Sequence, residues 1–213
     1  MTGRLVVASA NAHKAAELQD LLVSLGIGLD VVARPADLAV PAEDAPDFIG
    51  NARIKAAAVA AATGEWALAD DSGLEVDALD GAPGVRSARF AGDEASDADN
   101  VALLLDRLVG LGAVTAAERR ARFRCCIVVQ SPPDADGSVI ELVADGTVEG
   151  HIAGAPRGNG GFGYDPVFVP DDPVGGASAP GRTFAEMSGI EKASISHRGR
   201  ALRAIAPQLA RLP

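Results

Sequence analysis

Apolar residues in the first third of the chain follow two different spacings. Short apolar runs, such as RLVVA at residues 4–8, are typical of buried strands, whereas leucines three and four positions apart, as in KAAELQDLLVSLG at 14–26, are typical of a helix. Asp47 predicts a helix start, and Gly64 lies just beyond the expected end of that helix. The expected elements are, in order, strand 4–8, helix 14–26, strand 29–33, helix 47–62 and strand 66–69. This alternation favours an α/β sheet.

The rest of the chain is less regular and predicts a mixed sheet. RFRCCIVVQ and VIELVADGTVEG are expected strands, and the turn-rich segment PPDADG between them favours antiparallel pairing. Residues 170–182, rich in proline and glycine, are expected to form a surface loop. The other expected elements are a strand and turn in GLEVDALDGAPG, a helix at 97–110, a helix around 188–194 and a last amphipathic helix that carries Leu202, Ile205 and Leu209.

Length and charge limit the classes of function. At 213 residues the chain is long enough for a substantial core, and we expect residues 1–213 to form a single domain. A net charge of −10 disfavours nonspecific binding to nucleic acid or to anionic membranes, and no apolar run reaches the ~20 residues of a membrane span. The adjacent Cys125 and Cys126 rarely permit a disulfide, and metal binding by them is the alternative. We therefore expect a cytoplasmic protein with a small-molecule partner.

Asp70 and Asp71 stand side by side in LADDSGLEV, where the apolar strand is expected to end. Side chains alternate along an extended strand, so the two carboxylates should point in opposite directions. We expect one to face a ligand crevice, where a carboxylate suits Mg²⁺, and the other to brace a turn by accepting backbone N–H groups near Ser72 and Gly73. The alternative is a solvated turn, which is common for sequences such as DDSG.

Two further segments carry candidate nucleotide-binding residues. SANAHK at 9–14 opens a helix whose free N–H groups favour anions, and Lys14 adds a positive charge; taken alone, the segment is also typical of an ordinary capped turn. RGNGGFGYDPVF at 157–168 places Phe162 and Tyr164 among four glycines. Phe162 is a candidate for stacking on a base, with packing into the core as the alternative, and Tyr164 is expected in the core.

A cluster of hydrogen-bond donors lies near the C-terminus. EKASISHRGRAL at 191–202 places Lys192, His197 and Arg198 near a break between two helices. Because the chain has only 19 basic residues against 29 acidic ones, this cluster is a candidate for binding an anion or the carbonyl edge of a base. A solvated basic helix face is the alternative.

Together these segments resemble the inosine triphosphate pyrophosphatase family, which hydrolyses non-standard purine nucleoside triphosphates such as dITP, ITP and XTP. The motifs that carry the resemblance are, in order, SANAHK, NARIKA, ADDSGLEVDAL, GAPGVRSARFAG, GNGGFGYDPVF and SHRGRAL. The resemblance implies an α/β fold with a central mixed sheet flanked by helices, in two lobes around a nucleotide-binding cleft. It also implies a homodimer, a Mg²⁺ cofactor and cleavage to the nucleoside monophosphate and pyrophosphate.

The resemblance assigns roles to matching residues. Asp71 is expected to be the general base and a Mg²⁺ ligand, with Glu43 as the second ligand and Asp44 as the alternative to it. Lys55 is expected to reach phosphate, and Gly50 stands where the family usually has a glutamate. The other expected nucleotide-binding residues are Ser9, Ala10, Asn11, Ala12, His13 and Lys14 for the triphosphate, Ser72 beside the general base, Phe162, Gly163, Tyr164 and Asp165 around the base, and Lys192, His197 and Arg198 at the purine 6-oxo group.

Two other functions are compatible with these residues. One is a less selective nucleotide phosphatase that releases orthophosphate. The other is a regulatory module that binds nucleotides without catalysis, which the altered acidic segment EDAPDFIGNA favours because a metal ligand could be lost there.

Overall fold

The computed structural model describes residues 3–171 and 181–212. The expected surface loop at 170–182 falls largely on residues 172–180, which lie outside the described residues. The chain forms two compact units, which we call unit 1 and unit 2. Unit 1 contains Met1–Asp71, Cys125–Gly146 and Arg198–Pro213, and unit 2 contains Ser72–Arg124 and Thr147–His197.

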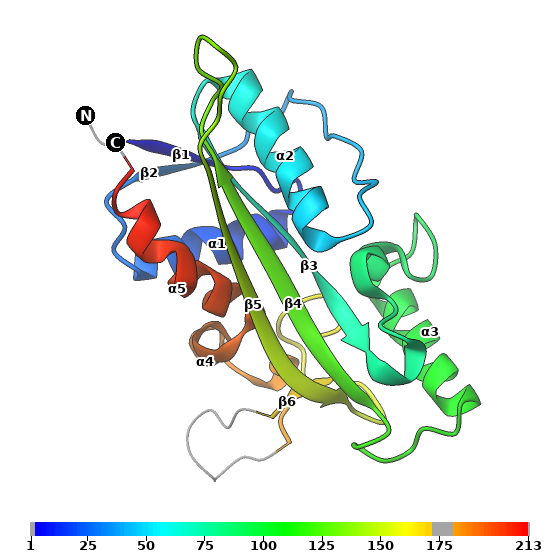
Figure 1. Cartoon of the computed structure of the whole chain (residues 1–213). Helices are drawn as coiled ribbons and strands as arrows, with labels where there is room; N and C mark the ends of the chain where they lie inside the picture. The colour runs from blue at the N-terminus through cyan, green and yellow to red at the C-terminus, as the bar shows by residue number, and fades with distance from the viewer. Residues whose placement is uncertain (1–2, 172–180, 213) are drawn as a thin grey trace. The chain divides into compact units, whose positions relative to one another are not determined.

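Among the described residues, a six-stranded sheet has the order β2-β1-β3-β4-β5-β6 (Figure 1). β1 pairs in parallel with β2 and β3, and β5 pairs antiparallel with β6, so the prediction of a mixed sheet is confirmed. None of the described helices is both long enough and apolar enough to cross a membrane. The strands are β1 (Arg4–Val7), β2 (Asp30–Ala33), β3 (Trp66–Val76), β4 (Arg120–Gln130), β5 (Glu141–Ile152) and β6 (Phe168–Pro170), and the α-helices are α1 (Ala12–Ser24), α2 (Phe48–Thr63), α3 (Asp97–Gly110), α4 (Gly189–Ile195) and α5 (His197–Leu209).

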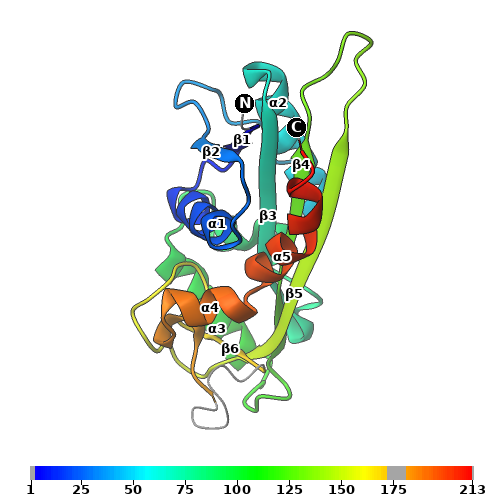
Figure 2. The ribbon, with the colours of Figure 1, turned by 90° about the vertical axis from the view of Figure 1, so that its left-hand side faces the viewer.

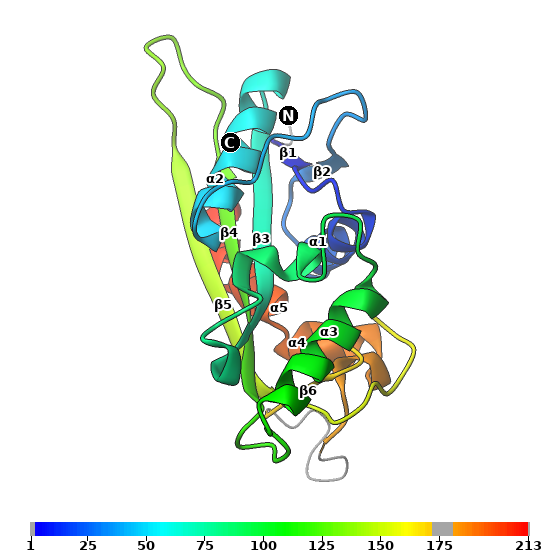
Figure 3. The same cartoon turned by 90° about the vertical axis from the view of Figure 1, so that its right-hand side faces the viewer.

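In unit 1, helices cover both faces of the sheet. α2 lies on one face, and α1 and α5 lie on the other (Figure 2, Figure 3). α2 is rich in alanine, and its small side chains at Ala52, Ala56 and Ala60 pack closely against Val6 of β1 and Ala67 of β3. The buried apolar residues of the other two helices include Leu18, Leu22, Leu202 and Ile205.

The core of unit 2 is built around aromatic rings. Phe123 of β4 lies edge-on to Phe168 of β6, with ring centroids 4.7 Å apart, and Phe184 lies 5.1 Å from Phe168. Leu104 and Leu108 of α3 complete this core. α3 and α4 lie on the same side of β5 (Figure 2, Figure 3).

Two helices, α2 and α3, start close to the residues at which the sequence predicted them to start. Asp47 caps α2, because its Oδ1 accepts the Gly50 N–H at 2.8 Å, and Gly64 ends the helix with a φ of 68°. Ser96 and Asp99 form a reciprocal capping box at the start of α3. Both helices therefore lie where the sequence places them.

The predicted end of the third strand was wrong. We expected it to end at residue 69, but β3 continues to Val76 and contains both aspartates. β1, its parallel neighbour, ends sooner, since Val7 pairs with Leu68. Asp70 and Asp71 therefore lie within a strand, just beyond the end of the neighbouring strand.

Candidate active site

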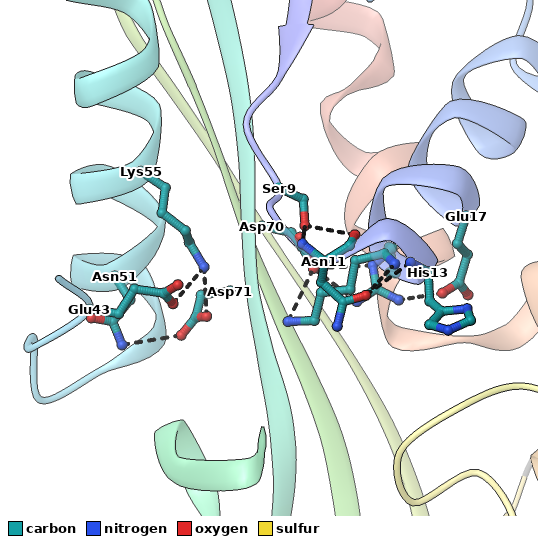
Figure 4. A network of polar contacts seen from close by, with 11 residues as sticks. Ser9, Asn11, His13, Glu17, Glu43, Asn51, Lys55, Asp70 and Asp71 are labelled. Atoms are coloured by element: carbon teal, nitrogen blue, oxygen red, sulfur yellow. Dashed lines mark hydrogen bonds and ion pairs between the residues drawn. The ribbon is translucent and has the colours of Figure 1, made fainter. Parts of the chain in front are cut away.

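Asp70 and Asp71 of β3 point to opposite sides of the strand, as predicted (Figure 4). Asp70 faces α1 and α5, whereas Asp71 faces α2. Asp70 is 2% exposed and Asp71 is 6% exposed, so the solvated-turn alternative is wrong. The half-buried Ser72 follows them. Because a buried carboxylate is costly unless it is paired, the partners of each aspartate indicate what it does.

Asp70 forms an ion pair with Arg198 near the start of α5. Its Oδ2 accepts the Nε–H of Arg198 at 3.1 Å and an Nη2–H at 2.9 Å, and Lys14 Nζ lies 4.0 Å from the same oxygen. Nη1 of Arg198 donates to Glu17 of α1 at 2.5 Å. Burial alone would raise the pKa of Asp70, but Arg198 and Lys14 outweigh it and hold the pKa well below its usual range. Asp70 is therefore an ionised anchor that joins β3 to two helices.

Asp70 has the structural role predicted for one of the two aspartates, but its hydrogen-bond partner differs from the predicted one. The sequence predicted hydrogen bonds to nearby backbone N–H groups at a turn. The structure places Asp70 within β3 and pairs it with a guanidinium group 128 positions away. Arg198 is itself only 1% exposed, and its Nε, Nη1 and Nη2 all donate to carboxylates. Its expected contact with the purine base stays a prediction.

Asp71 shares a lysine with Glu43. Nζ of Lys55, in α2, donates to Oδ1 of Asp71 at 2.8 Å and to Oε2 of Glu43 at 2.9 Å. Nδ2 of Asn51 donates to the other oxygen of Asp71, Oδ2, at 3.3 Å. Asp44 is exposed. The structure therefore brings Glu43 to the same ammonium group as the carboxylate that the sequence predicts to be catalytic.

The shared lysine and its surroundings change the pKa values of Asp71 and Lys55. Burial raises the pKa of Asp71 and the neighbouring Glu43 adds to the rise; Lys55 and Lys14 oppose it but do not cancel it. Burial lowers the pKa of Lys55, but Asp71, Asp70 and Glu43 outweigh burial and raise it. Both pKa values are raised because two carboxylates share one ammonium group. The ammonium group of Lys55 stays charged, and it compensates the charge of Asp71 only in part. A carboxylate with a raised pKa is a better proton acceptor near neutral pH.

Glu43 and Asp71 also fit a Mg²⁺ ion. Mg²⁺ usually takes one or two carboxylates and completes its shell with water and phosphate oxygens. One oxygen of each carboxylate already reaches a common positive centre, Lys55 Nζ. Within residues 3–171 and 181–212, no group of three or more His, Cys, Asp or Glu side chains is arranged to hold a metal ion, so the remaining ligands would be water and substrate.

The predicted phosphate-binding segment, residues 9–14, joins β1 to α1. Asn11 caps α1, since its Oδ1 accepts the N–H groups of His13 at 2.9 Å and Lys14 at 3.1 Å. Ser9 Oγ donates to the Asn11 carbonyl oxygen at 3.3 Å. The capped-turn interpretation is therefore correct for Asn11. The exposed N-terminus of α1 and the Lys14 ammonium are the features that suit an anion.

In unit 2, the glycine-rich loop holds Phe162 beside Lys192. Oδ2 of Asp165 accepts the Phe162 backbone N–H at 2.9 Å and the Lys192 ammonium at 2.6 Å. Lys192 Nζ lies 4.9 Å from the centroid of the Phe162 ring. Gly161 has a φ of 71°, and a Cβ there would lie 2.0 Å from Asp165 Oδ2, so the turn requires glycine. The loop thus presents a half-buried aromatic ring together with a cation, as a base-binding site needs.

Two other predicted base-pocket residues pack in the core of unit 2. Tyr164 is buried, as predicted, and its hydroxyl donates to the Ser87 carbonyl oxygen at 2.9 Å. His197 is buried too, and its ring stacks on Phe123 with centroids 4.7 Å apart. The expected contact of His197 with a nucleotide stays a prediction.

Comparison with known families identifies the chain. Residues 5–208 match the model of the Ham1 family. The chain belongs to the Ham1 family. It is 47% identical to a dITP/XTP pyrophosphatase of Parasynechococcus marenigrum over 205 residues, which cover 96% of this chain and 94% of that protein. It is 48% identical to a dITP/XTP pyrophosphatase of Thermus thermophilus over 203 residues, which cover 95% of this chain and 89% of that protein.

Solved Ham1 structures have the same fold. A HAM1 protein from Coxiella burnetii matches with a TM-score of 0.82 at 37% identity, over 99% of this chain and 100% of that one. A dITP/XTP pyrophosphatase from Mycobacterium abscessus matches with a TM-score of 0.68 at 43% identity, over 97% and 99%. The family resemblance and the α/β fold predicted from the motifs are therefore confirmed.

Sequence reasoning missed two carboxylates that hold predicted site residues. Glu17 binds Arg198, and its position three residues after Lys14 on α1 was a signal that it lies on the same helix face. Asp97, at the start of α3, accepts the Gly163 N–H at 2.6 Å and so holds the glycine-rich loop. No local signal pointed to Asp97, because its partner lies 66 positions away.

Proposed function

We propose that this Ham1-family chain hydrolyses the non-standard purine nucleoside triphosphates dITP, ITP and XTP to the nucleoside monophosphate and pyrophosphate, with Mg²⁺ as cofactor. Its curated relatives make it a nucleoside triphosphate pyrophosphatase, which is a hydrolase. The observation that carries the proposal is the convergence of Asp71 and Glu43 on Nζ of Lys55, at 2.8 and 2.9 Å. This is a pair of carboxylates suited to Mg²⁺ next to a lysine suited to phosphate.

In this proposal, residues of unit 1 act on the phosphates. Cleavage between the α- and β-phosphates needs neutralised charge and an oriented water more than covalent chemistry. Asp71 and Glu43 would hold Mg²⁺, and the bound ion would supply neutralisation of the phosphate charge. Asp71 accepts the proton of the attacking water. Lys14 and the N-terminus of α1 bind the phosphate tail, and Lys55 passes from the carboxylates to a phosphate oxygen.

Residues of unit 2, together with Arg198 of unit 1, bind the base in this proposal. Phe162 stacks on the purine, and Lys192 donates to the 6-oxo group, with His197 and Arg198 as further donors. Support comes from the 4.9 Å between Lys192 Nζ and the Phe162 ring centroid. Hypoxanthine and xanthine present a carbonyl oxygen at position 6, whereas adenine presents an amino group that would face another donor. Such a mismatch costs ~1–3 kcal/mol for each buried group left unpaired.

We also propose a domain organisation, an oligomeric state and a cellular location for the protein. Residues 1–213 act as one domain, which is supported by a family match that runs continuously over residues 5–208. The protein is a homodimer, as the family resemblance implies. It works in the cytoplasm, where purine triphosphates are present, and the buried Cys125 and Cys126, which are not joined in a disulfide, are compatible with a reducing compartment.

A substrate panel tests the proposal. Purified protein is incubated with ITP, XTP, dITP, GTP and ATP, with Mg²⁺ or with a chelator, and the products are separated. We expect pyrophosphate and the monophosphate from ITP, XTP and dITP, only in the presence of Mg²⁺, and much slower turnover of ATP.

Two outcomes would replace the proposal with another function. Orthophosphate as the first product would indicate a nucleotide phosphatase. Binding of ITP without Mg²⁺-dependent turnover would indicate a regulatory module.

A further inference from the structure

We propose that Asn51, assisted by Gly50, is a positioning residue that fixes the Glu43 segment against Asp71 and thereby sets the spacing of the two metal-binding carboxylates. The inference rests on the proposed function for the identity of this pair as Mg²⁺ ligands. It assigns to two residues of α2 a role that neither the charge pattern nor the family motif indicates.

Asn51 uses both ends of its amide and is only 2% exposed. Its Oδ1 accepts the backbone N–H of Ala45 at 3.0 Å, and its Nδ2 donates to Oδ2 of Asp71 at 3.3 Å. The orientation of the amide follows from these partners, because a backbone N–H only donates and a carboxylate oxygen accepts. One neutral side chain therefore joins the segment that follows Glu43 to the strand that carries Asp71.

Gly50 allows the Glu43 segment to lie directly on α2. A Cβ at position 50 would lie 2.5 Å from the Cβ of Ala45 and 2.9 Å from Oδ1 of Asp47. Gly50 also donates its N–H to the same Asp47 oxygen at 2.8 Å. Glycine, which has no Cβ, leaves room for Ala45 at this position. Gly50 and Asn51 together form a seat for the segment, which we call the Ala45 seat.

The two oxygens of the Asp71 carboxylate have different hydrogen-bond donors. Asn51 holds Oδ2, while Oδ1 faces Lys55, which also holds Glu43. A neutral amide is needed at this place because an acid of the same size would offer Asp71 no N–H and would add a third negative charge. Partners that orient metal ligands in this way typically change metal affinity about 10- to 100-fold when they are removed.

Three substitutions test the Ala45 seat. Asn51→Ala removes both hydrogen bonds, and Asn51→Asp keeps the size but reverses the interaction with Asp71. Gly50→Ala displaces Ala45 while leaving the amide in place. Gly110→Ala in α3 is the matched control, since it is a helical glycine whose added Cβ meets nothing within 4 Å.

The main measurement is the affinity of the purified full chain for Mn²⁺ as a probe for Mg²⁺, from the electron paramagnetic resonance signal of the free ion. Thermal unfolding followed by circular dichroism without metal shows whether each variant folds. We expect Asn51→Ala and Asn51→Asp to raise the Mn²⁺ dissociation constant about 10- to 100-fold and Gly50→Ala about tenfold, near the lower end of that range. Gly110→Ala should bind Mn²⁺ as the wild type does.

The outcomes separate this inference from the proposed function. Folded Asn51→Ala or Gly50→Ala protein with wild-type Mn²⁺ affinity would overturn the inference, and so would wild-type protein that binds no Mn²⁺. If Asn51→Ala fails to fold, the result with Gly50→Ala decides. Weakened Mn²⁺ binding in the variants, combined with wild-type protein that does not hydrolyse ITP, would support the inference and refute the proposed function.

Discussion

Replacement of aspartate by asparagine should mainly lower stability at position 70 and mainly lower turnover at position 71. Asp70→Asn removes the negative charge that faces Arg198, whereas the proposal gives Asp71 a role in catalysis. We therefore expect Asp70→Asn to lower the free energy of unfolding strongly. Asp71→Asn should lower turnover and leave stability near the wild-type value, because it relieves repulsion with Glu43 while it weakens the pair with Lys55.

The magnitude for Asp70→Asn follows from its contacts. Oδ2 of Asp70 accepts two N–H groups from a guanidinium that is 1% exposed, at 3.1 and 2.9 Å. Removing one partner of a buried ion pair costs about 3–5 kcal/mol. The asparagine keeps one carbonyl acceptor, and Glu17 still pairs with Arg198, so we expect about 3 kcal/mol, at the lower end.

Urea denaturation at pH 7 measures this loss. With a slope of about 2–3 kcal/mol per molar urea, the midpoint should fall by about 1 M. Asp145, exposed in β5, offers a matched surface control as Asp145→Asn, which should stay close to the wild-type midpoint. Asp70→Asn protein with an unchanged midpoint would show that the Asp70–Arg198 pair contributes nothing to the fold.

Three further predictions concern unit 2 and acid stability. Phe162→Ala should weaken binding of every purine triphosphate by about 1–3 kcal/mol in calorimetric titrations if the ring stacks on the base, and wild-type affinity would exclude stacking. Tyr164→Phe should cost about 1 kcal/mol in urea denaturation, through the lost hydrogen bond to Ser87, while leaving the KM for ITP unchanged; a raised KM would place the hydroxyl at the substrate. Because the pKa of Asp70 is lowered on folding, its pair stabilises the protein above the unfolded pKa of about 3.9 and loses this effect as the pH falls below it, so the gap between wild type and Asp70→Asn should narrow by about 1 kcal/mol at pH 3. A gap of constant size between pH 7 and pH 3 would contradict the lowered pKa.

Local signals predicted the helices well, because the residues that end a helix are neighbours in sequence. Asp47 and Gly64 predicted the bounds of α2, and the leucine spacing between residues 97 and 110 predicted α3. Local reasoning also predicted that the side chains of Asp70 and Asp71 point in opposite directions, because side-chain alternation along a strand does not depend on the partner residues.

Long-range partners account for what the sequence did not reveal. Two adjacent acids are typical of a turn, so the end of β3 was placed too early. The strand continues because Arg198, 128 positions away from Asp70, and Lys55, 16 positions away from Asp71, neutralise the acids. The hold of Asp97 on the glycine-rich loop likewise depends on tertiary contact and leaves no trace in either local sequence.

Turnover of ITP by Asp71→Asn tests the central claim most directly. The initial rate of pyrophosphate release from ITP and Mg²⁺ is measured for the wild type and for Asp71→Asn, after urea denaturation has shown that the variant is folded. We predict pyrophosphate from the wild type and a rate about 10²–10⁴-fold lower for the variant, the range typical of a lost general base. A folded Asp71→Asn protein that releases pyrophosphate at the wild-type rate would contradict the account.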